Sequence, residues 1–563
     1  MSKLLLVIAL VVLIGNTLVI SRDHQDSWVL EGLEIPFVLF VVTYMVAFFS
    51  ERKPSRMVML AIIGRTVFLL IPNLKYVWFQ GPFIDQHQQY ALANHVYNEG
   101  HISAEPAFAL AYTSTPLMHL FFSIFSIILN VPVVDSMKYL PVLLSSLYPL
   151  LTYIIVEKMG FSQGRAILKY ALFISSVPFT LEQYVVTGSL FGILLAFLIL
   201  SNLILMFQKS DRGYWFVCII FVFALASAHS VTSVILILLL LSIMVLQRVS
   251  YFRPKSFLRA SIALTFASIG AAWLTFFANY NLQGIVRQIF VAVPSGATPP
   301  SEYIHATFFD HIRVNILSAI KSFSVSYGAD AFLLLLTLGG LIILLRRRKQ
   351  LNSAANFVFF FGWLALVIMV FGVLIKLGAT RTMHFERLFY PVFSSVLFVY
   401  LGRNARARTW IRPVILLSIT LLAPIELYRC QPLVASANIL YKDLPPDVPM
   451  GYIGLVNSIY QRQMINFAES YVSGRIAADS VTRNQIVGLT RINFSVANLI
   501  RYYPLNRNQP ERRYDYFLIH LPGKSGPFGE MPQISTRSLI LEAIHNSSVV
   551  YTNGESYVLA GNY

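Results

Sequence analysis

Apolar runs long enough to cross a lipid bilayer recur along the whole chain. Two of them are "LLLVIALVVLIGNTLVI" at residues 4–20 and "VILILLLLSIMVL" at residues 234–246. About 20 apolar residues span the hydrocarbon core of a membrane, and only helices and closed barrels satisfy their backbone there. Because 56% of the residues are hydrophobic and only 12% are charged, the sequence predicts a polytopic α-helical membrane protein.

The apolar runs predict about 13 spans, with the first one retained. They lie near 3–20, 34–50, 57–72, 138–156, 166–181, 189–207, 214–228, 232–247, 259–278, 330–345, 355–376, 388–402 and 412–427. The first run follows Met1-Ser2-Lys3 and has no small-residue cleavage site before "SRDHQDS". This pattern predicts a membrane span rather than a cleaved signal peptide.

The basic residues encode topology. The formal net charge is +17, and the clusters "ERKPSR", "EKMGFSQGRAILK", "QKSDRGYW" and "RRRKQ" alternate with apolar runs. If the N-terminus is cytoplasmic, nearly all these clusters fall on the cytoplasmic side, as the positive-inside rule requires. A nucleic-acid partner is therefore not expected, and the two cysteines offer no metal-binding spacing.

The same charge pattern sets the outer loops. Counting "PLMHLFFSIFSIILNV" at 116–131 as a span would place "RRRKQ" outside. We therefore expect a surface helix at 116–131 within a long outer loop at 73–137, and a second long outer loop at 279–329. Residues 1–427 are predicted to form the membrane domain.

The tail, residues 428–563, changes in composition. "GRIAADS" and "YDYFLIHL" look like short strands, and Asn553-Gly554 joins two alternating runs as in a β-hairpin. We expect a small extracytoplasmic α/β domain on a multi-pass protein of the cell membrane.

Two carboxylates are the candidates for catalysis. Asp85 lies in the polar stretch "FQGPFIDQHQQYALANHVYNEGHI", which also holds His87. A carboxylate at the membrane face can act as a general base, although a solvated loop aspartate is the simpler interpretation. Glu182 follows an apolar run in "SVPFTLEQYVVTGSL", where an ionisable group is costly and often functional. Both fall on the outer side, so they are able to share one site.

Basic residues on the outer side form the second group of candidates. "KLGATRTMHFERLFYPVF" contains Lys376, Arg381, His384 and Arg387, together with Glu386. A guanidinium matches the geometry of phosphate oxygens, and an ion pair with Glu386 is the equally weighted alternative.

Three further residues are weaker candidates for substrate contacts. They are His87, His229 at an outer helix end and Arg287 in the long loop. For His229 a capping or packing role is the simpler interpretation. A divalent cation, Mg²⁺ or Mn²⁺, held by Asp85 and Glu182 stays open, because scattered carboxylates leave no local pattern.

The order of these features resembles the GT-C superfamily of membrane glycosyltransferases. The resemblance covers most of residues 57–427. It rests on "GPFIDQHQQYALA", the helix beginning "TSTPLMHLFF", the outer acidic turn "SVPFTLEQYVV" and "RTMHFERLFYPVF", which is similar to an arginine-bearing loop before a "YP" span.

The resemblance implies sugar transfer from a polyprenyl- or dolichyl-phosphate-linked donor to a lipid-linked glycan or protein acceptor at the outer face. Asp85 would be the base or metal-associated acid, and Glu182 the acidic residue of the second outer loop. Arg381 and Arg387, with His384 and Lys376, would hold the donor phosphate. The sequence lacks the family's doubled acidic motif, which leaves metal dependence open. It also lacks the tryptophan-tryptophan-aspartate motif of oligosaccharyltransferases.

Two other functions stay open. A transporter or lipid flippase usually carries charges inside its spans, and Arg65 is the clearest such charge. A membrane-anchored binding or assembly protein would act through its tail, which leaves the polar stretch around Asp85 unexplained.

Overall fold

The structure is a computed structural model of the whole chain. It describes residues 34–75, 84–102, 115–161, 164–177, 188–208, 212–248, 260–279, 282–283, 332–347, 350–374, 379–402, 467–468, 471, 476–478, 497–498, 516–520, 548–552 and 556–560. The predicted spans at 3–20 and 412–427 lie outside these residues.

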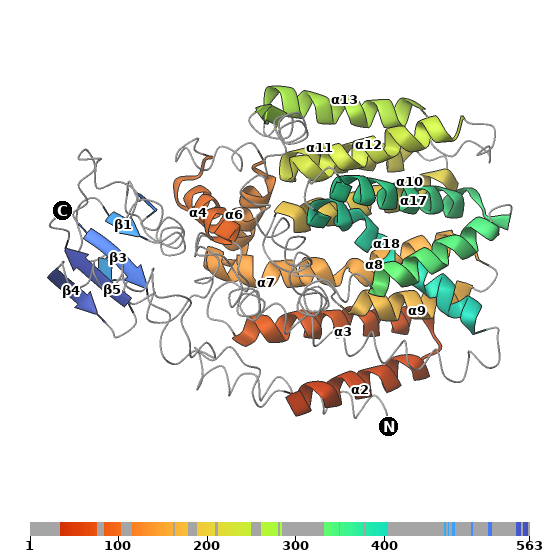
Figure 1. Cartoon of the computed structure of the whole chain (residues 1–563), viewed down its shortest axis with the longest axis horizontal. Helices are drawn as coiled ribbons and strands as arrows, with labels where there is room; N and C mark the ends of the chain where they lie inside the picture. Colours follow the sequence, from red (N-terminus) through yellow and green to blue (C-terminus); the bar gives the residue numbers. More distant parts are fainter. Residues whose placement is uncertain are drawn as a thin grey trace, which may run out of the picture.

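Helices account for nearly all of the described part before residue 403 (Figure 1). They are α2 (Glu34–Ser50), α3 (Pro54–Lys75), α4 (Ile84–Glu99), α6 (Leu117–Leu129), α7 (Val133–Ser146), α8 (Tyr148–Lys158), α9 (Gly164–Ser176), α10 (Gly188–Gln208), α11 (Arg212–Ala228), α12 (Ser230–Leu246), α13 (Ala260–Phe276), α17 (Ser353–Leu374) and α18 (Ala379–Leu401). A further apolar helix covers Phe332–Arg346. Each predicted span within the described residues falls mostly on one of these helices or on the α7–α8 pair, and the bounds differ most for α9 and α18.

The outside of the bundle is as apolar as its core. Large apolar side chains are exposed on several helices, among them Val38 on α2, Phe216 on α11 and Phe276 on α13, which is 78% exposed. Soluble proteins rarely expose apolar patches of this extent. Within the described residues, the pair Val133–Lys158 is long and apolar enough to cross a bilayer, and nine other apolar helical stretches are shorter.

A proline divides the predicted span 138–156 into two helices. α7 ends at Ser146 and α8 begins at Tyr148, with Pro149 in its first turn. Proline has no N–H, so the carbonyl oxygen of Ser145, four residues earlier, loses its usual helical donor. At the joint between α7 and α8, a cap bond from a backbone N–H serves the Ser145 carbonyl oxygen instead.

Two predicted loops are wrong in part, because they contain helix. The polar stretch around Asp85 forms α4, and "ATRTMHFERLFYP" forms the first part of α18, which begins at Ala379 rather than near 388. Both segments are too polar to show the apolar periodicity by which buried helices are recognised.

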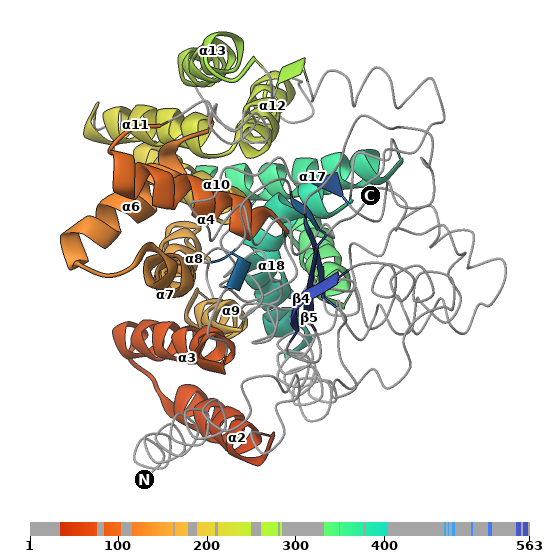
Figure 2. The ribbon, with the colours of Figure 1, turned by 90° about the vertical axis from the view of Figure 1, so that its left-hand side faces the viewer.

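The end of the bundle opposite the α2–α3 turn carries α4 and α6. Figure 2 shows these two helices lying across that end. With 13 residues, α6 is about 20 Å long, as long as α9, so a surface helix stays a prediction. It also packs against α4 and α7.

The described part of the tail contains five strands in one sheet. β1 (Ile476–Ala478), β2 (Ala497–Asn498), β3 (Tyr516–His520), β4 (Ser548–Thr552) and β5 (Ser556–Ala560) are arranged in the order β2-β1-β3-β5-β4. β4 and β5 pair antiparallel, as the hairpin signal predicted, and β1 pairs parallel with β2 and β3. In Figure 1 the sheet lies at the same end as α4 and α6. A separate extracytoplasmic domain over 428–563 stays a prediction.

Candidate functional site

Asp85 and His87 lie in the first turn of α4. A carboxylate near a helix N-terminus is favoured by the unpaired N–H groups and the helix dipole, which is consistent with a helix that begins at Ile84. The side chains of both residues lie outside the described part, so their roles stay predictions.

Two buried side chains on α6 hold α4 in place. His119 Nε2 donates a hydrogen bond to Gln89 Oε1, and both residues are at most 3% exposed. Ser123 Oγ donates to the carbonyl oxygen of Ala93 over 2.6 Å. We call these two bonds the α4–α6 latch.

The latch fixes the register of the two helices. Each bond joins residues that are 30 apart in sequence, so α4 and α6 run parallel with a constant offset. One turn before Gln89 the same offset places Asp85 level with Thr115, beside the start of α6. The helix that carries the candidate base is therefore anchored one turn away from it.

His119 is neutral in this environment. Burial lowers the pKa of His119 from its usual 6.5 to about 3, because the imidazolium would lose its hydration. A neutral imidazole with its proton on Nε2 is the form that donates to Gln89.

Glu182 belongs to the connection between α9 and α10. Residues 178–187, with Glu182, lie outside the described part. α9 ends at Ser176, and the connection starts from this helix end. The predicted span ended five residues later.

The candidate phosphate-binding residues form the first turns of α18. Their spacing of three places Arg381, His384 and Arg387 along one broad side of the helix, and Glu386 off that side. Arg381 lies one turn before Phe385, whose ring is buried and lies 6.1 Å from the Phe361 ring. The Arg381 position is therefore on the inward side of α18. The side chains of these four charged residues lie outside the described part.

His229 caps α12. Its Nδ1 accepts a hydrogen bond from the backbone N–H of Thr232 and lies 2.6 Å from the Thr232 hydroxyl. This is the geometry expected of a capping histidine, and a contact with substrate stays a prediction. Lys376 and Arg287 lie outside the described residues.

Arg65 is a buried guanidinium within the bundle. It is 1% exposed, and its hydrogen bonds include 2.8 Å contacts to the carbonyl oxygens of Ser145 and Ser175. An arginine that lines a transport path would face water or a substrate, whereas this one bonds the backbone of α7 and α9.

Sequence reasoning missed the roles of Gln89, His119 and Ser123. Single polar residues in apolar helices offer no spacing pattern that identifies a partner 30 residues away. The one signal was the polar character of the 116–131 helix face, which carries His119, Ser123 and Ser126, all buried.

Comparison with known proteins identifies the fold but no sequence relative. No protein-family model matches the chain, and no curated protein matches its sequence. The archaeal oligosaccharyltransferase AglB from Archaeoglobus fulgidus, solved with an inhibitory peptide and a dolichol-phosphate, superposes with a TM-score of 0.53. It is 10% identical in sequence, and the match covers 83% of this chain and 69% of AglB.

The arabinofuranosyltransferase AftD from Mycobacteria superposes with a TM-score of 0.50 at 14% identity. The match covers 91% of this chain but only 40% of AftD. Both are GT-C glycosyltransferases, so the chain has the fold of that superfamily, as the sequence motifs suggested.

Proposed function

We propose that this protein is a membrane glycosyltransferase that moves a sugar from a polyprenyl-phosphate-linked donor to a lipid-linked glycan or protein acceptor at the outer face. The observation that carries the proposal is the GT-C fold over 83% of the chain. Within that fold α4, with Asp85 in its first turn, lies at the end of the bundle opposite the α2–α3 turn (Figure 1). The basic residues of that turn predict that it is cytoplasmic.

Asp85 acts as the general base in this proposal. Its carboxylate accepts the proton of the acceptor as the acceptor atom attacks the anomeric carbon. The bond between that carbon and the lipid phosphate oxygen breaks, and polyprenyl phosphate leaves with the electron pair. With a β-linked donor this single displacement inverts the configuration.

Basic residues in and just before α18 stabilise the leaving phosphate in this proposal. Arg381 and Arg387, with His384 and Lys376, supply positive charge where negative charge develops in the transition state. Glu182 is assigned to the same site from the second outer loop. His87, His229 and Arg287 are assigned to substrate contacts.

A divalent cation is an open part of the proposal. No cluster of three or more His, Cys, Asp or Glu side chains occurs among the residues whose side chains the structure describes. Asp85 and Glu182, the carboxylates proposed for Mg²⁺ or Mn²⁺, lie outside that part, and oxygen ligands suit either ion. No catalytic step is assigned to a cation.

Sugar analysis of cells lacking the protein tests the proposal. Lipid-linked and protein-linked glycans are measured by mass spectrometry after complementation with wild type, Asp85→Asn or Asp135→Asn at matched membrane abundance. Asp135 is a fitting control because it also lies in the first turn of a helix, α7. We expect one sugar to be lost, restored by wild type and Asp135→Asn, and not restored by Asp85→Asn, since loss of a general base costs about 10²- to 10⁴-fold in rate.

Two results would count against the proposal. Unchanged glycans in the deletion would remove the transferase function and favour transport or assembly. Full rescue by Asp85→Asn, with one sugar lost in the deletion, would keep the transferase and remove Asp85 as its base.

A further inference from the structure

Arg65 lies on one of the helices that precede the candidate catalytic segments and bonds the end of another. It lies in α3, which leads into the connection to α4 and Asp85. Its Nη1 donates to the carbonyl oxygens of Ser175, over 2.8 Å, and Val177, over 3.4 Å. These two oxygens are at the C-terminal end of α9, where the segment with Glu182 begins.

The same guanidinium completes the α7–α8 joint. Arg65 Nε donates over 2.8 Å to the Ser145 carbonyl oxygen, the acceptor that Pro149 cannot serve. Nη2 donates over 3.0 Å to the Ser145 hydroxyl. One side chain therefore bonds carbonyl oxygens at the C-terminal ends of two helices, where the negative end of each helix dipole also favours a cation.

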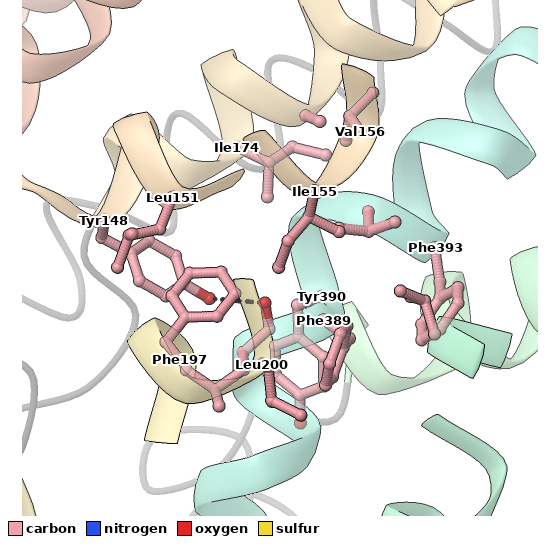
Figure 3. Packing of buried hydrophobic residues seen from close by; sticks show 14 of the residues in the cluster. Tyr148, Leu151, Ile155, Val156, Ile174, Phe197, Leu200, Phe389, Tyr390 and Phe393 are labelled. Atoms are coloured by element: carbon pink, nitrogen blue, oxygen red, sulfur yellow. Dashed lines mark hydrogen bonds between the residues drawn. The ribbon is translucent and has the colours of Figure 1, made fainter. Parts of the chain in front are cut away.

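Tyr148 extends these contacts to α18. The guanidinium carbon of Arg65 lies 4.8 Å from the centre of the Tyr148 ring, within the range of a cation–π interaction. The Tyr148 hydroxyl donates over 2.9 Å to the carbonyl oxygen of Leu388 (Figure 3). Leu388 follows Arg387 directly, so the chain of contacts ends beside the candidate phosphate-binding residues.

We propose that Arg65 is a positioning residue that fixes, from inside the bundle, three segments that lead into the proposed donor site. These are α3, which precedes α4 in the chain, the C-terminal end of α9 and, through Tyr148, the first turns of α18. The inference rests on the proposed function, because the site it positions is the one proposed above. Arginine suits the role because its planar fork holds several acceptors at fixed angles, and charge-assisted bonds in a low-dielectric interior are strong.

Distances between spin labels test the positioning directly. In full-length protein with Cys218→Ala and Cys430→Ala, pairs of labels are placed at positions 86 and 183, and at positions 86 and 380. Electron paramagnetic resonance then gives the width of each distance distribution. We expect Arg65→Met to broaden both distributions at least twofold. Arg56→Met should leave both unchanged, because Arg56 is an exposed arginine near the start of the same helix.

A second variant keeps the test informative where Arg65→Met does not fold. Tyr148→Phe retains the ring but removes the bond to Leu388. It should broaden the 86/380 pair and leave the 86/183 pair unchanged. If Arg65→Met folds, unchanged widths of both label pairs in that variant would overturn the inference. If only Tyr148→Phe folds, an unchanged width of the 86/380 pair would overturn it.

Binding of undecaprenyl phosphate, measured by native mass spectrometry on the same samples, connects position with function. We expect at least tenfold weaker binding in Arg65→Met and no change in Arg56→Met. Broadened distances with unchanged binding would overturn the assignment to the donor site. Absence of binding by the wild type would count against the proposed function, and the label distances would still decide whether Arg65 positions the three segments.

Discussion

The centre of the bundle and the end that carries α4 and α6 are both organised by buried polar side chains, but over different lengths of chain. Arg65 bonds residues 80 and 110 positions away, and Tyr148 bonds Leu388, 240 positions away. The α4–α6 latch joins residues only 30 apart. The comparison teaches that two sets of contacts have separate tasks. Those of Arg65 and Tyr148 join distant helices, whereas the latch places the helix of Asp85, so separate variants should disturb them.

The largest stability effect is expected at the centre. In Gly340→Ala the added Cβ would clash with the carbonyl oxygen of Phe393 in α18. The helix Phe332–Arg346 would have to move away from α18, at a cost of about 3 kcal/mol. Thermal unfolding in detergent would show the loss, and Gly164→Ala, which meets nothing within 4 Å, should behave as wild type. Equal stability of the two variants would show that the centre is not closely packed there.

At the outer end, the expected effect is on ligand rather than fold. Arg381→Ala should weaken undecaprenyl phosphate binding about 10- to 100-fold, the usual loss for removing hydrogen bonds to a charged group. The unfolding temperature should not change. The exposed Arg56, at the opposite end of the bundle, provides the control variant Arg56→Ala. Equal weakening by both variants would indicate a general charge effect instead of a site.

The latch should be sensitive to acid. The pKa of His119 is near 3 in the folded protein and near 6.5 when exposed. The unfolded chain therefore binds the proton first as the pH falls. The stability that His119 contributes is complete above pH 6.5 and is lost toward pH 3, by about 1.4 kcal/mol per pH unit in that window.

Unfolding curves between pH 7.5 and 4.5 check this prediction. His119→Gln keeps an N–H donor for Gln89 and should flatten the acid dependence. His101→Gln, at an exposed position, should not. An identical acid dependence in all three proteins would assign it to groups outside the latch.

The smallest effect is expected from one bond of the latch. Ser123→Ala removes the donor to Ala93 and should cost about 1 kcal/mol, with a modest fall in transfer rate. Ser268→Ala removes an exposed bond within α13 and should cost less. If transfer fell as far as in Asp85→Asn, Ser123 would have a direct role in the site.

The apolar runs predicted the helices well, because every span in lipid needs a long apolar stretch whose backbone bonds itself. The predicted span 34–50 coincides with α2, and 189–207 differs from α10 by one residue at each end. That 116–131 is not a span stays a prediction from the charge pattern, since one more crossing would invert every later loop.

The arrangement of the candidate site could be predicted far less well. α4 and the start of α18 are polar helices without an apolar stripe, so they were taken for loops. Arg65 was identified as a charge inside the bundle, but its acceptors are backbone carbonyls, and every residue has one of those. Only the fold decides which carbonyls a buried guanidinium reaches, as Ser145 and Ser175 show.

The acceptors of Arg65 also set an order of events during synthesis. An arginine at the centre of a span raises the cost of membrane insertion by about 2.5–3.5 kcal/mol. The groups that offset this cost are made 80 and 110 residues later. α3 therefore leaves the ribosome before the helices that hold the acceptors of Arg65 are made. The guanidinium gains these acceptors only when α7 and α9 have packed against α3. The residue proposed to position the finished site thus makes its own helix depend on later helices during biogenesis.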